Sequence, residues 1–295
     1  MAYPLVSVVI PTHRRSQWLA DALDSVARQD YSPLQVIVVE DGADDATRQV
    51  IATAKLPVEH HVIPHCGRPG VVRNYGIERA AGEFIALLDD DDLWDPPKLT
   101  RQVQQLLENP AAPASFTNVR LEFPDGLSGE AGPPPRAAWL STRSALLCGC
   151  FIYPSSMLIR RNSLSAAGGF DDDRFAEAYG LCLRLSRQGD FAHLNEPLVT
   201  MRRHGAGNST ASVEGTWTET IDLLNAERSA GGLTLGDRIR LRRVMALGFA
   251  YLGRALPRKS NERRRLLWKA FCLSPLASQW WRVQEWRSKR RARSV

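Results

Sequence analysis

One short stretch constrains the fold of this chain more than any other: an apolar run that ends in four consecutive aspartates. Phe84–Leu88 has the length and composition of a strand buried on both faces, as in a parallel sheet. Asp89–Asp92 follow at once, at the strand end where open α/β sheets bind their ligands. Four adjacent carboxylates repel one another, and Mg²⁺ or Mn²⁺ would compensate them with hard oxygen ligation. We therefore predict a divalent-cation site here; the alternative is a solvated acidic turn.

Three earlier apolar runs have the same design, each ending in a polar turn before a helical segment. Their order with Phe84–Leu88 is βαβαβαβ, which predicts a doubly wound parallel sheet. The turns around Thr12, Asp41 and Asp89 should then meet in one crevice. Ser16 and Asp95 are the predicted N-caps of two helices. The three runs are Leu5–Ile10, Gln35–Val39 and Val58–Ile63.

The pattern changes after residue 97. We predict a helix over 97–108, a strand over 114–123, a Gly/Pro loop over 124–137, a strand over 150–161, a helix over 177–189, a last strand before a basic loop over 191–210, and mostly helix from Trp217 onward.

Composition excludes several classes of protein. The chain of 295 residues is 44% hydrophobic and 24% charged, as a folded soluble protein is. No apolar run approaches the roughly 18–20 residues of a membrane span, and the first residues lack the pattern of a signal peptide. The five cysteines are an odd number and are predicted to be reduced thiols. We expect a cytoplasmic location, with peripheral attachment to the inner face of the plasma membrane as an option.

The net charge of +6 hides an asymmetry between the body and the tail. Residues 251–295 carry thirteen Lys or Arg and two Glu, so the remaining 250 residues sum to −5. Four tail tryptophans interleave with these basic residues, a composition suited to an anionic lipid surface. A helix packed on the rest of the protein is the alternative, and no nucleic-acid partner is expected. The tryptophans are Trp268, Trp280, Trp281 and Trp286.

The residues around the aspartates suit a nucleoside diphosphate. A divalent metal would bridge its phosphate oxygens, and Asp41 could accept hydrogen bonds from a base or ribose. Arg15 and Arg73 could contact phosphate or base, Arg73 from the start of a helix. His204 lies in the basic Gly-rich segment "RRHGAGNS", which could fold over a diphosphate. Taken alone, each of the two arginines is more often an ordinary surface residue, and His204 is equally compatible with an ordinary surface histidine.

Taken together and in order, these segments resemble the family 2 glycosyltransferases. The resemblance covers about residues 5–210 and implies a GT-A fold, that is, a Rossmann-like, doubly wound mixed sheet, here with a C-terminal helical appendage. It divides the chain into a transferase domain over 1–212 and a helical, basic, Trp-rich region over 213–295. The matching segments are "VSVVIPTHRR", "QVIVVEDGADDAT", "GVVRNYGIERAAGEFIALLDDDDLW", "PPKLTRQ", "SSMLIRR", "GGFDDD" and "MRRHGAGNS".

The resemblance also implies an activity. Members of this family move a sugar, with inversion, from a nucleoside diphosphate sugar to an acceptor hydroxyl, using Mg²⁺ or Mn²⁺. By analogy, the acceptor is a glycan or a lipid-linked molecule in surface polysaccharide or glycolipid assembly. The metal is expected on Asp91 and Asp89. The expected nucleotide-sugar contacts are Pro11, Thr12, His13, Arg15, Glu40, Asp41, Arg73, Asn74, Asp89, Asp90 and His204.

One departure from the family pattern concerns the general base. The family usually reads "EDYDLWLRL" where this chain reads "EAYGLCLRL", which puts Ala178 at the position of the base. Alanine cannot accept a proton, so Glu177 and Asp171 are the substitutes that we consider. The alternative is a catalytically silent family member that binds a nucleotide sugar or a partner protein. A sugar-1-phosphate nucleotidyltransferase would want a Gly-rich phosphate loop after the first strand, and "PTHRRSQW" has none.

Overall fold

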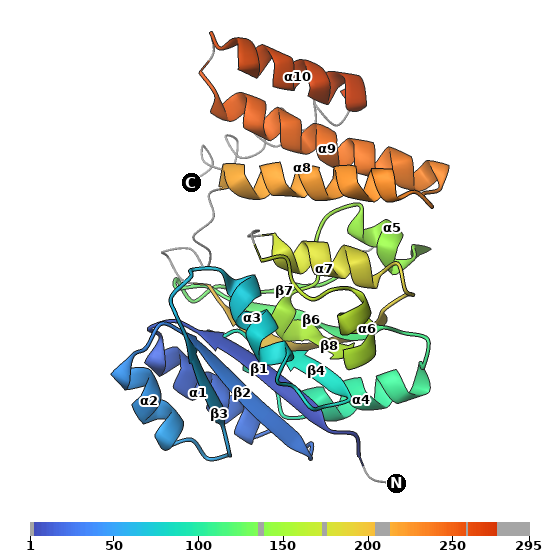
Figure 1. The fold of residues 1–295 in the computed structure, drawn as a ribbon. Helices are drawn as coiled ribbons and strands as arrows, with labels where there is room; N and C mark the ends of the chain where they lie inside the picture. Colours follow the sequence, from blue (N-terminus) through green and yellow to red (C-terminus); the bar gives the residue numbers. More distant parts are fainter. Residues whose placement is uncertain (1–2, 135–138, 173–175, 204–212, 258, 276–295) are drawn as a thin grey trace. The chain divides into compact units, whose positions relative to one another are not determined.

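The computed structural model describes residues 3–134, 139–172, 176–203, 213–257 and 259–275. Its internal contacts divide the chain into two compact units. The first unit comprises residues 1–143 and 151–210 and holds a mixed β-sheet flanked by helices (Figure 1). The second unit comprises residues 144–150 and 211–295 and consists, in its described part, mainly of helices.

The sheet of the first unit runs in the order β3-β2-β1-β4-β8-β6-β9-β5, and β7 pairs with β6. The β3-β2-β1-β4 half is parallel, whereas β8 is antiparallel to both β4 and β6. The predicted α/β class with a mixed sheet is therefore confirmed. The strands are β1 (Val6–Thr12), β2 (Leu34–Asp41), β3 (Glu59–Ile63), β4 (Phe84–Leu87), β5 (Asp92–Trp94), β6 (Ala114–Glu122), β7 (Ser128–Ala131), β8 (Met157–Arg160) and β9 (Ala192–Arg202).

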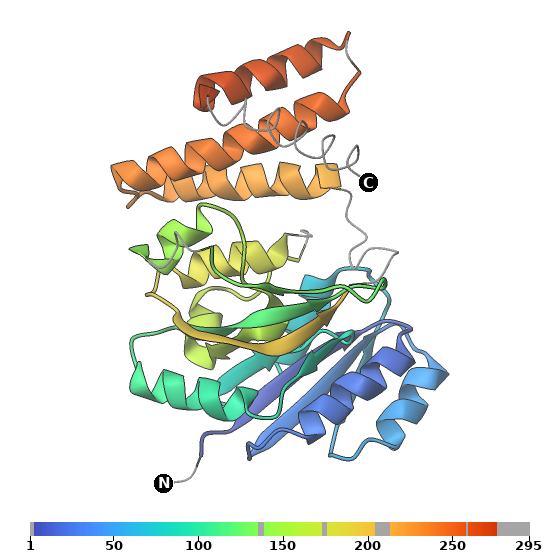
Figure 2. The ribbon, with the colours of Figure 1, turned by 180° about the vertical axis from the view of Figure 1, so that it is seen from behind.

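Helices cover both faces of this sheet, as the two opposite views show (Figures 1 and 2). On one face, alternate strand residues such as Val8 and Ala86 form a core with Leu19 and Leu99 from α1 and α4. On the other face α3 lies against β1 and β2, and a Cβ on its Gly76 would come within 2.5 Å of Val9. The helices of the unit are α1 (Ser16–Ala27), α2 (Asp45–Ala52), α3 (Pro69–Ile77), α4 (Lys98–Glu108), α6 (Arg161–Ala166) and α7 (Glu177–Leu185), and α5 (Thr142–Leu146) crosses the boundary.

Several local predictions are wrong at element boundaries. Ser16 is the first residue of α1, not its N-cap, and the N-cap of α4 is Pro97. Asp95 instead gives its backbone carbonyl to the Lys98 N–H, while its carboxylate pairs with Arg120. The segment predicted as a loop over 124–137 contains β7, which pairs with β6 as a hairpin. Strand β5 has only three residues and is too short for the sequence pattern to indicate it. The strand predicted over 150–161 is shortened to β8 by a 3₁₀ turn over Pro154–Ser156.

The second unit contains the long helices α8 (Val213–Ala230), α9 (Leu235–Ala255) and α10 (Asn261–Leu273). A capping box between Thr234 and Asp237 starts α9, and Asp237 also accepts a hydrogen bond from the Ser144 hydroxyl at 2.6 Å. None of the helices within the described ranges is long and apolar enough to cross a membrane. The helical prediction beyond Trp217 holds as far as residue 275, and residues 276–295, with three of the tail tryptophans, lie outside the described part.

Candidate functional site

The predicted polar turns meet at the carboxyl ends of β1, β2 and β4, because these strands are parallel neighbours. Two groups of side chains lie there, and we name them by their chemistry. The acidic cluster consists of Thr12, Arg15, Arg73, Asp89, Asp90, Asp91 and Glu177. The histidine cluster consists of His13, Asp41, His65, Cys66 and Gly67.

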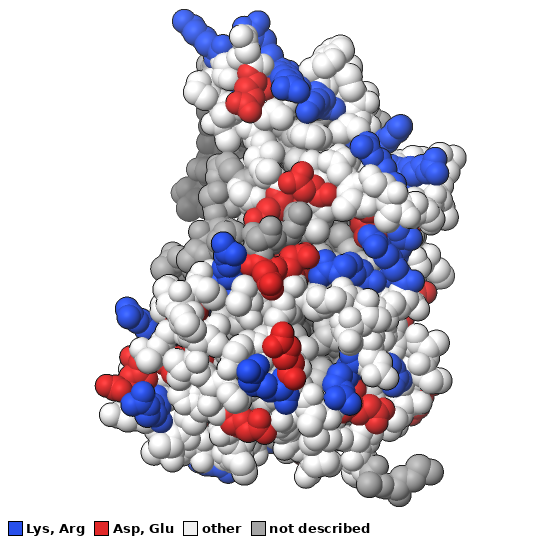
Figure 3. Space-filling model, in the orientation of Figure 1, with Lys and Arg blue, Asp and Glu red and all other residues white. Residues whose placement is uncertain are grey.

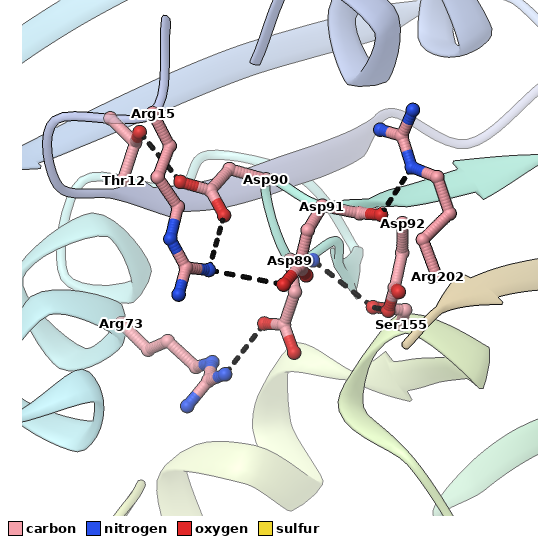
Figure 4. Close-up of polar contacts among 9 residues, drawn as sticks. All are labelled: Thr12, Arg15, Arg73, Asp89, Asp90, Asp91, Asp92, Ser155 and Arg202. Atoms are coloured by element: carbon pink, nitrogen blue, oxygen red, sulfur yellow. Dashed lines mark hydrogen bonds and ion pairs between the residues drawn. The ribbon is translucent and has the colours of Figure 1, made fainter. Parts of the chain in front are cut away.

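Hydroxyl and guanidinium groups from the first turn hold the aspartates in place (Figure 4). The Thr12 hydroxyl donates to Asp90 Oδ2 at 2.8 Å, and Arg15 Nη1 lies 3.3 Å from Asp90 Oδ1 and 3.0 Å from Asp91 Oδ2. Both carboxylates are buried. Burial, reinforced by the neighbouring carboxylates, raises the pKa of Asp90 to about 6 in spite of the Thr12 and Arg15 contacts.

Arg73 joins two carboxylates that are distant in sequence. Its Nη2 donates to Asp89 Oδ1 at 2.6 Å and its Nη1 to Glu177 Oε1 at 2.7 Å. Arg73 and Glu177 are buried, and Asp89 is about one-quarter exposed. Burial opposes the charge on Arg73, but the two carboxylates hold its pKa above its usual range. Burial raises the pKa of Glu177, and Arg73 limits that rise.

The fourth aspartate does not belong to the acidic cluster. Asp92 begins β5, and its Oδ2 accepts a hydrogen bond from the Ser155 hydroxyl. That hydroxyl in turn accepts the Asp89 N–H at 3.0 Å, so Ser155 ties the turn to β8 (Figure 4). Burial raises the pKa of Asp92 well above its usual range. Asp92 is thus part of the buried support of the turn.

A buried lysine, Lys98, follows the run of aspartates in the sequence. Lys98 is fully buried at the start of α4, and its Nζ lies 4.0 Å from the centre of the Trp94 ring. Its Nζ has no hydrogen-bond partner within the described part of the chain. Burial holds the pKa of Lys98 well below its usual range. This amine is therefore a local cost to stability rather than a contributor to it.

In the histidine cluster, Asp41 is fixed by backbone groups. Its carboxylate accepts the N–H groups of Cys66 and Gly67 at 2.7 and 2.9 Å. These hydrogen bonds hold the pKa of Asp41 below its usual range, although burial acts in the opposite direction. The rings of His13 and His65 are stacked, with centroids 4.3 Å apart, and both Nδ1 atoms contact Asp41.

Several predicted site residues belong to neither the acidic cluster nor the histidine cluster. Glu40 is buried and pairs with His60 Nε2 at 2.9 Å, on the side of β3. Asn74 bonds Phe170 and Asp172, and Asp171 is held by both oxygens to Arg184. Pro11 lies within β1, and His204 falls outside the described residues.

Two residues that support the acidic cluster, Arg202 and Ser155, were missed by sequence reasoning. Arg202 Nε donates to the backbone carbonyl of Asp91 at 2.7 Å, and Ser155 supports Asp89 as described above. Arg202 stands in the segment "MRRHG", whose two arginines could not be told apart by pattern. Strand β9 ends beside β5, and only that pairing shows which arginine reaches the turn.

The donor chemistry of the acidic cluster fits Mg²⁺ or Mn²⁺. Asp89 and Asp91 offer carboxylate oxygens alone, and these ions take one or two carboxylates with the substrate's phosphates. The carboxylates of Asp89–Asp92 do not bring oxygen atoms of three different side chains close enough together to form a group of three ligands for one ion. Within the described ranges, the group of three convergent metal-binding side chains is His13, Asp41 and His65.

Comparison with known proteins gives the same reading of the fold and of the family. Residues 7–136 match the family model of glycosyl transferase family 2. An uncharacterised protein of Mycobacterium tuberculosis H37Rv is 31% identical over 213 residues, which are 68% of this chain and 60% of that protein. The putative teichuronic acid biosynthesis glycosyltransferase TuaG of Bacillus subtilis is 35% identical over 126 residues, 42% of this chain and 50% of TuaG. The chain thus spans only part of the length of these relatives.

Solved structures resemble this fold at low sequence identity. Residues 1–349 of Staphylococcus aureus TarS, in complex with UDP-GlcNAc, match with a TM-score of 0.69 at 17% identity, covering 95% of this chain and 92% of that one. The mannosyltransferase PcManGT of Pyrobaculum calidifontis, in complex with GDP-Man and Mn²⁺, matches with a TM-score of 0.58 at 16% identity, covering 94% and 86%. The match of residues 7–136 to the family model shows that the chain belongs to glycosyl transferase family 2, and the likeness to the solved structures shows that its fold is that of the GT-A transferases.

Proposed function

We propose that this protein transfers a sugar from a nucleoside diphosphate sugar to an acceptor hydroxyl, with inversion at the sugar. The observation that carries the proposal is the acidic cluster, in which aspartates after β4 meet two arginines at the carboxyl ends of parallel strands. Carboxylates for a cation beside guanidinium groups for phosphate form the combination that a sugar diphosphate requires.

Each part of the site then has a role. Asp91 and Asp89 would hold Mg²⁺ or Mn²⁺, and a bound ion would supply positive charge to balance that of the departing diphosphate. Arg15 contacts the diphosphate beside them, and Asp41 binds the base or ribose. TarS and PcManGT, whose structures hold UDP-GlcNAc and GDP-Man, support a nucleoside diphosphate sugar as the class of donor.

The acceptor hydroxyl must also lose a proton. Ala178 cannot take it, and the two candidate carboxylates differ in their surroundings. Asp171 is held by both oxygens to Arg184, whereas Glu177 is linked through Arg73 to the acidic cluster. Its pKa is raised by burial, which makes a carboxylate a stronger base. We therefore assign the proton to Glu177 rather than to Asp171, and its pairing with Arg73 makes Glu177 a poorer base than an unpaired carboxylate.

Ala178 also supports a second candidate function, which is binding of the nucleotide sugar without transfer. The two functions share the donor site and differ only in turnover. General-base assistance is typically worth ~10²–10⁴-fold in rate, so its loss could reduce transfer to a negligible rate.

A donor panel with and without Mn²⁺ tests the proposal. UDP-, GDP- and dTDP-sugars are screened by thermal shift and then by calorimetry, because a ligand of the folded state raises the melting temperature. Release of nucleoside diphosphate is then followed with lipid extracts as acceptors. Asp91→Ala should abolish binding and release, whereas Asp45→Ala, an 87% exposed aspartate on α2, should not. If no nucleotide binds, the proposal fails; binding without release favours the silent binder.

The surface of the C-terminal helices suggests where the protein binds its acceptor. Trp268 and Phe271 on α10 are exposed and stacked on each other, and Arg264, Arg265 and Lys269 lie on the same helix. Lys and Arg side chains also gather over α9 and α10 on the face drawn in Figure 3. We propose that this surface contacts anionic lipid on the cytoplasmic face of the plasma membrane and that the acceptor is lipid-linked, as in surface polysaccharide assembly.

Vesicle co-sedimentation tests the lipid contact. The protein should sediment with phosphatidylglycerol vesicles and not with phosphatidylcholine vesicles, and added salt should weaken the binding. Trp268→Ala should reduce it, whereas Trp139→Ala, an exposed tryptophan of the first unit, should leave it unchanged. Equal sedimentation with both lipids, or none with either, contradicts this proposal.

A further inference from the structure

The histidine cluster has the geometry of a metal site. His13 follows β1, Asp41 ends β2 and His65 follows β3, so three neighbouring parallel strands bring them together. One ligand atom of each residue lies within 4.8 Å of the others. This spacing is compatible with a single ion at about 2 Å from each ligand after small side-chain movements.

The hydrogen bonds around the cluster orient His13 and Asp41. The Asp41 carbonyl can only accept, so His13 Nδ1, 2.5 Å away, donates to it and leaves the lone pair on Nε2. Histidines that bind metals usually donate their other N–H in this way. Asp41 is ionised and is oriented by the N–H groups of Cys66 and Gly67. His65 is 55% exposed and has room to turn toward an ion.

A fourth ligand is available in the same loop. The Cys66 Sγ lies 3.8 Å from the Arg68 carbonyl and outside the convergent group of His13, Asp41 and His65, so the thiol reaches the ion by turning about its side-chain bond. The thiol would lose its proton on binding a metal, which makes the affinity dependent on pH. Two imidazoles, one carboxylate and one thiolate form a tetrahedral set typical of Zn²⁺, unlike the oxygen-only donors of the acidic cluster.

We propose that His13, Asp41, His65 and Cys66 form a zinc site, and that zinc bound there excludes the base of the donor. The second half rests on the proposed function, because Asp41 is the residue assigned to the base or ribose. An Asp41 carboxylate that binds zinc has fewer lone pairs left to accept a hydrogen bond from the base. Zinc would then act as a competitive inhibitor at an ion site separate from the Mg²⁺ or Mn²⁺ site.

Direct binding of Zn²⁺ and Co²⁺ tests the site without any nucleotide. The full chain carries Cys148→Ser and Cys150→Ser, which remove two exposed thiols that are neighbours in the sequence. It should bind one ion, with the intense visible absorption of tetrahedral Co²⁺ and a thiolate-to-cobalt band. His65→Gln should weaken binding at least about tenfold, and Cys66→Ser should remove the thiolate band. His60→Gln, a histidine of β3 that pairs with Glu40, should change neither. Absence of binding, or binding unaffected by His65→Gln, overturns the zinc site.

Competition then tests the second half. With Mg²⁺ present, Zn²⁺ should raise the apparent Kd of UDP or GDP for the wild-type chain and should not do so for His65→Gln. If zinc binds and the nucleotide Kd stays the same, the exclusion of the base is wrong. If no nucleotide binds even without zinc, the donor function fails while the zinc site stands, so the two failures are distinguishable.

Discussion

The acidic cluster and the histidine cluster both lie at the carboxyl ends of parallel strands and differ in how their side chains are held in place. In the acidic cluster the buried carboxylates depend on arginines, as in the Asp89–Arg73–Glu177 chain. In the histidine cluster Asp41 depends on two backbone N–H groups, and the side chain of His65 is 55% exposed. Buried charges that neutralise one another are costly to separate, whereas exposed rings are not. The first cluster therefore stabilises the fold as well as forming the proposed donor site, whereas the second contributes little to the stability of the fold.

Breaking the acidic cluster should have the largest effect. Arg73→Met leaves Asp89 and Glu177 without their shared cation, and such a loss typically costs about 3–5 kcal/mol. Urea denaturation measures the change in the free energy of unfolding. The double variant Arg73→Met/Glu177→Gln should recover part of the loss, because it removes one of the stranded carboxylates. A loss below about 1 kcal/mol for the single variant would show that the cluster is not part of the stable fold.

Removing the expected metal ligand should weaken binding of the donor more than it lowers the stability of the fold. Asp91→Ala should weaken Mn²⁺-dependent binding of a nucleoside diphosphate about 10³-fold, equivalent to about 4 kcal/mol. Calorimetry with and without Mn²⁺ measures the difference, and Asp45→Ala is the control. Equal Mn²⁺ dependence in wild type and variant would remove Asp91 from the metal site.

Restoring the family's carboxylate should increase turnover. Ala178→Asp places a base beside Glu177 on α7, and general-base assistance predicts a rise of about 10²-fold, or about 2.7 kcal/mol in the barrier. The comparison variant is Ala178→Asn, which has the same shape and no basicity. Product release measured under saturating donor gives kcat. Equal rates for the Asp and Asn variants would mean that the base lies elsewhere.

Lys98, whose buried Nζ lacks a hydrogen-bond partner among the described residues, tests whether such burial is costly. Its pKa is lowered on folding, so above that pKa the unfolded chain binds a proton that the folded chain lacks. Burial of Lys98 therefore lowers the free energy of unfolding most at low pH. This loss shrinks as the pH rises toward about 10.4, the pKa of a lysine in the unfolded chain, by at most about 1.4 kcal/mol per pH unit. Lys98→Met should stabilise the protein at pH 7 by at least about 1 kcal/mol. The gap between variant and wild type should narrow on going to pH 10, and parallel curves would refute this account.

The smallest effect is expected in the histidine cluster. His65→Gln should change the free energy of unfolding by less than about 0.5 kcal/mol, because the side chain is half exposed and Asp41 keeps its two backbone hydrogen bonds. The same urea denaturation applies, in the presence of a chelator. A loss as large as that of Arg73→Met would erase the difference between the two clusters.

Much of the fold was predictable from local pattern. Apolar runs of strand length, separated by helical segments, indicate parallel strands because each run must be buried on both faces. The convergence of Thr12, Asp41 and Asp89 follows from that order, since parallel strands end at the same edge. The family resemblance, carried by motifs in their order, also needs no coordinates.

The sequence by itself determined which residues stand at the strand ends, because burial and chain order leave parallel strands few arrangements. Only the tertiary structure decided which charges meet. The link from Arg73 to Glu177 spans 104 positions in the chain, and the contact of Arg202 with Asp91 spans 111. No local pattern encodes these pairs, because they depend on how helices and distant strands are placed around the sheet. The same placement puts Asp92 under the turn and assembles His13 and His65 around Asp41.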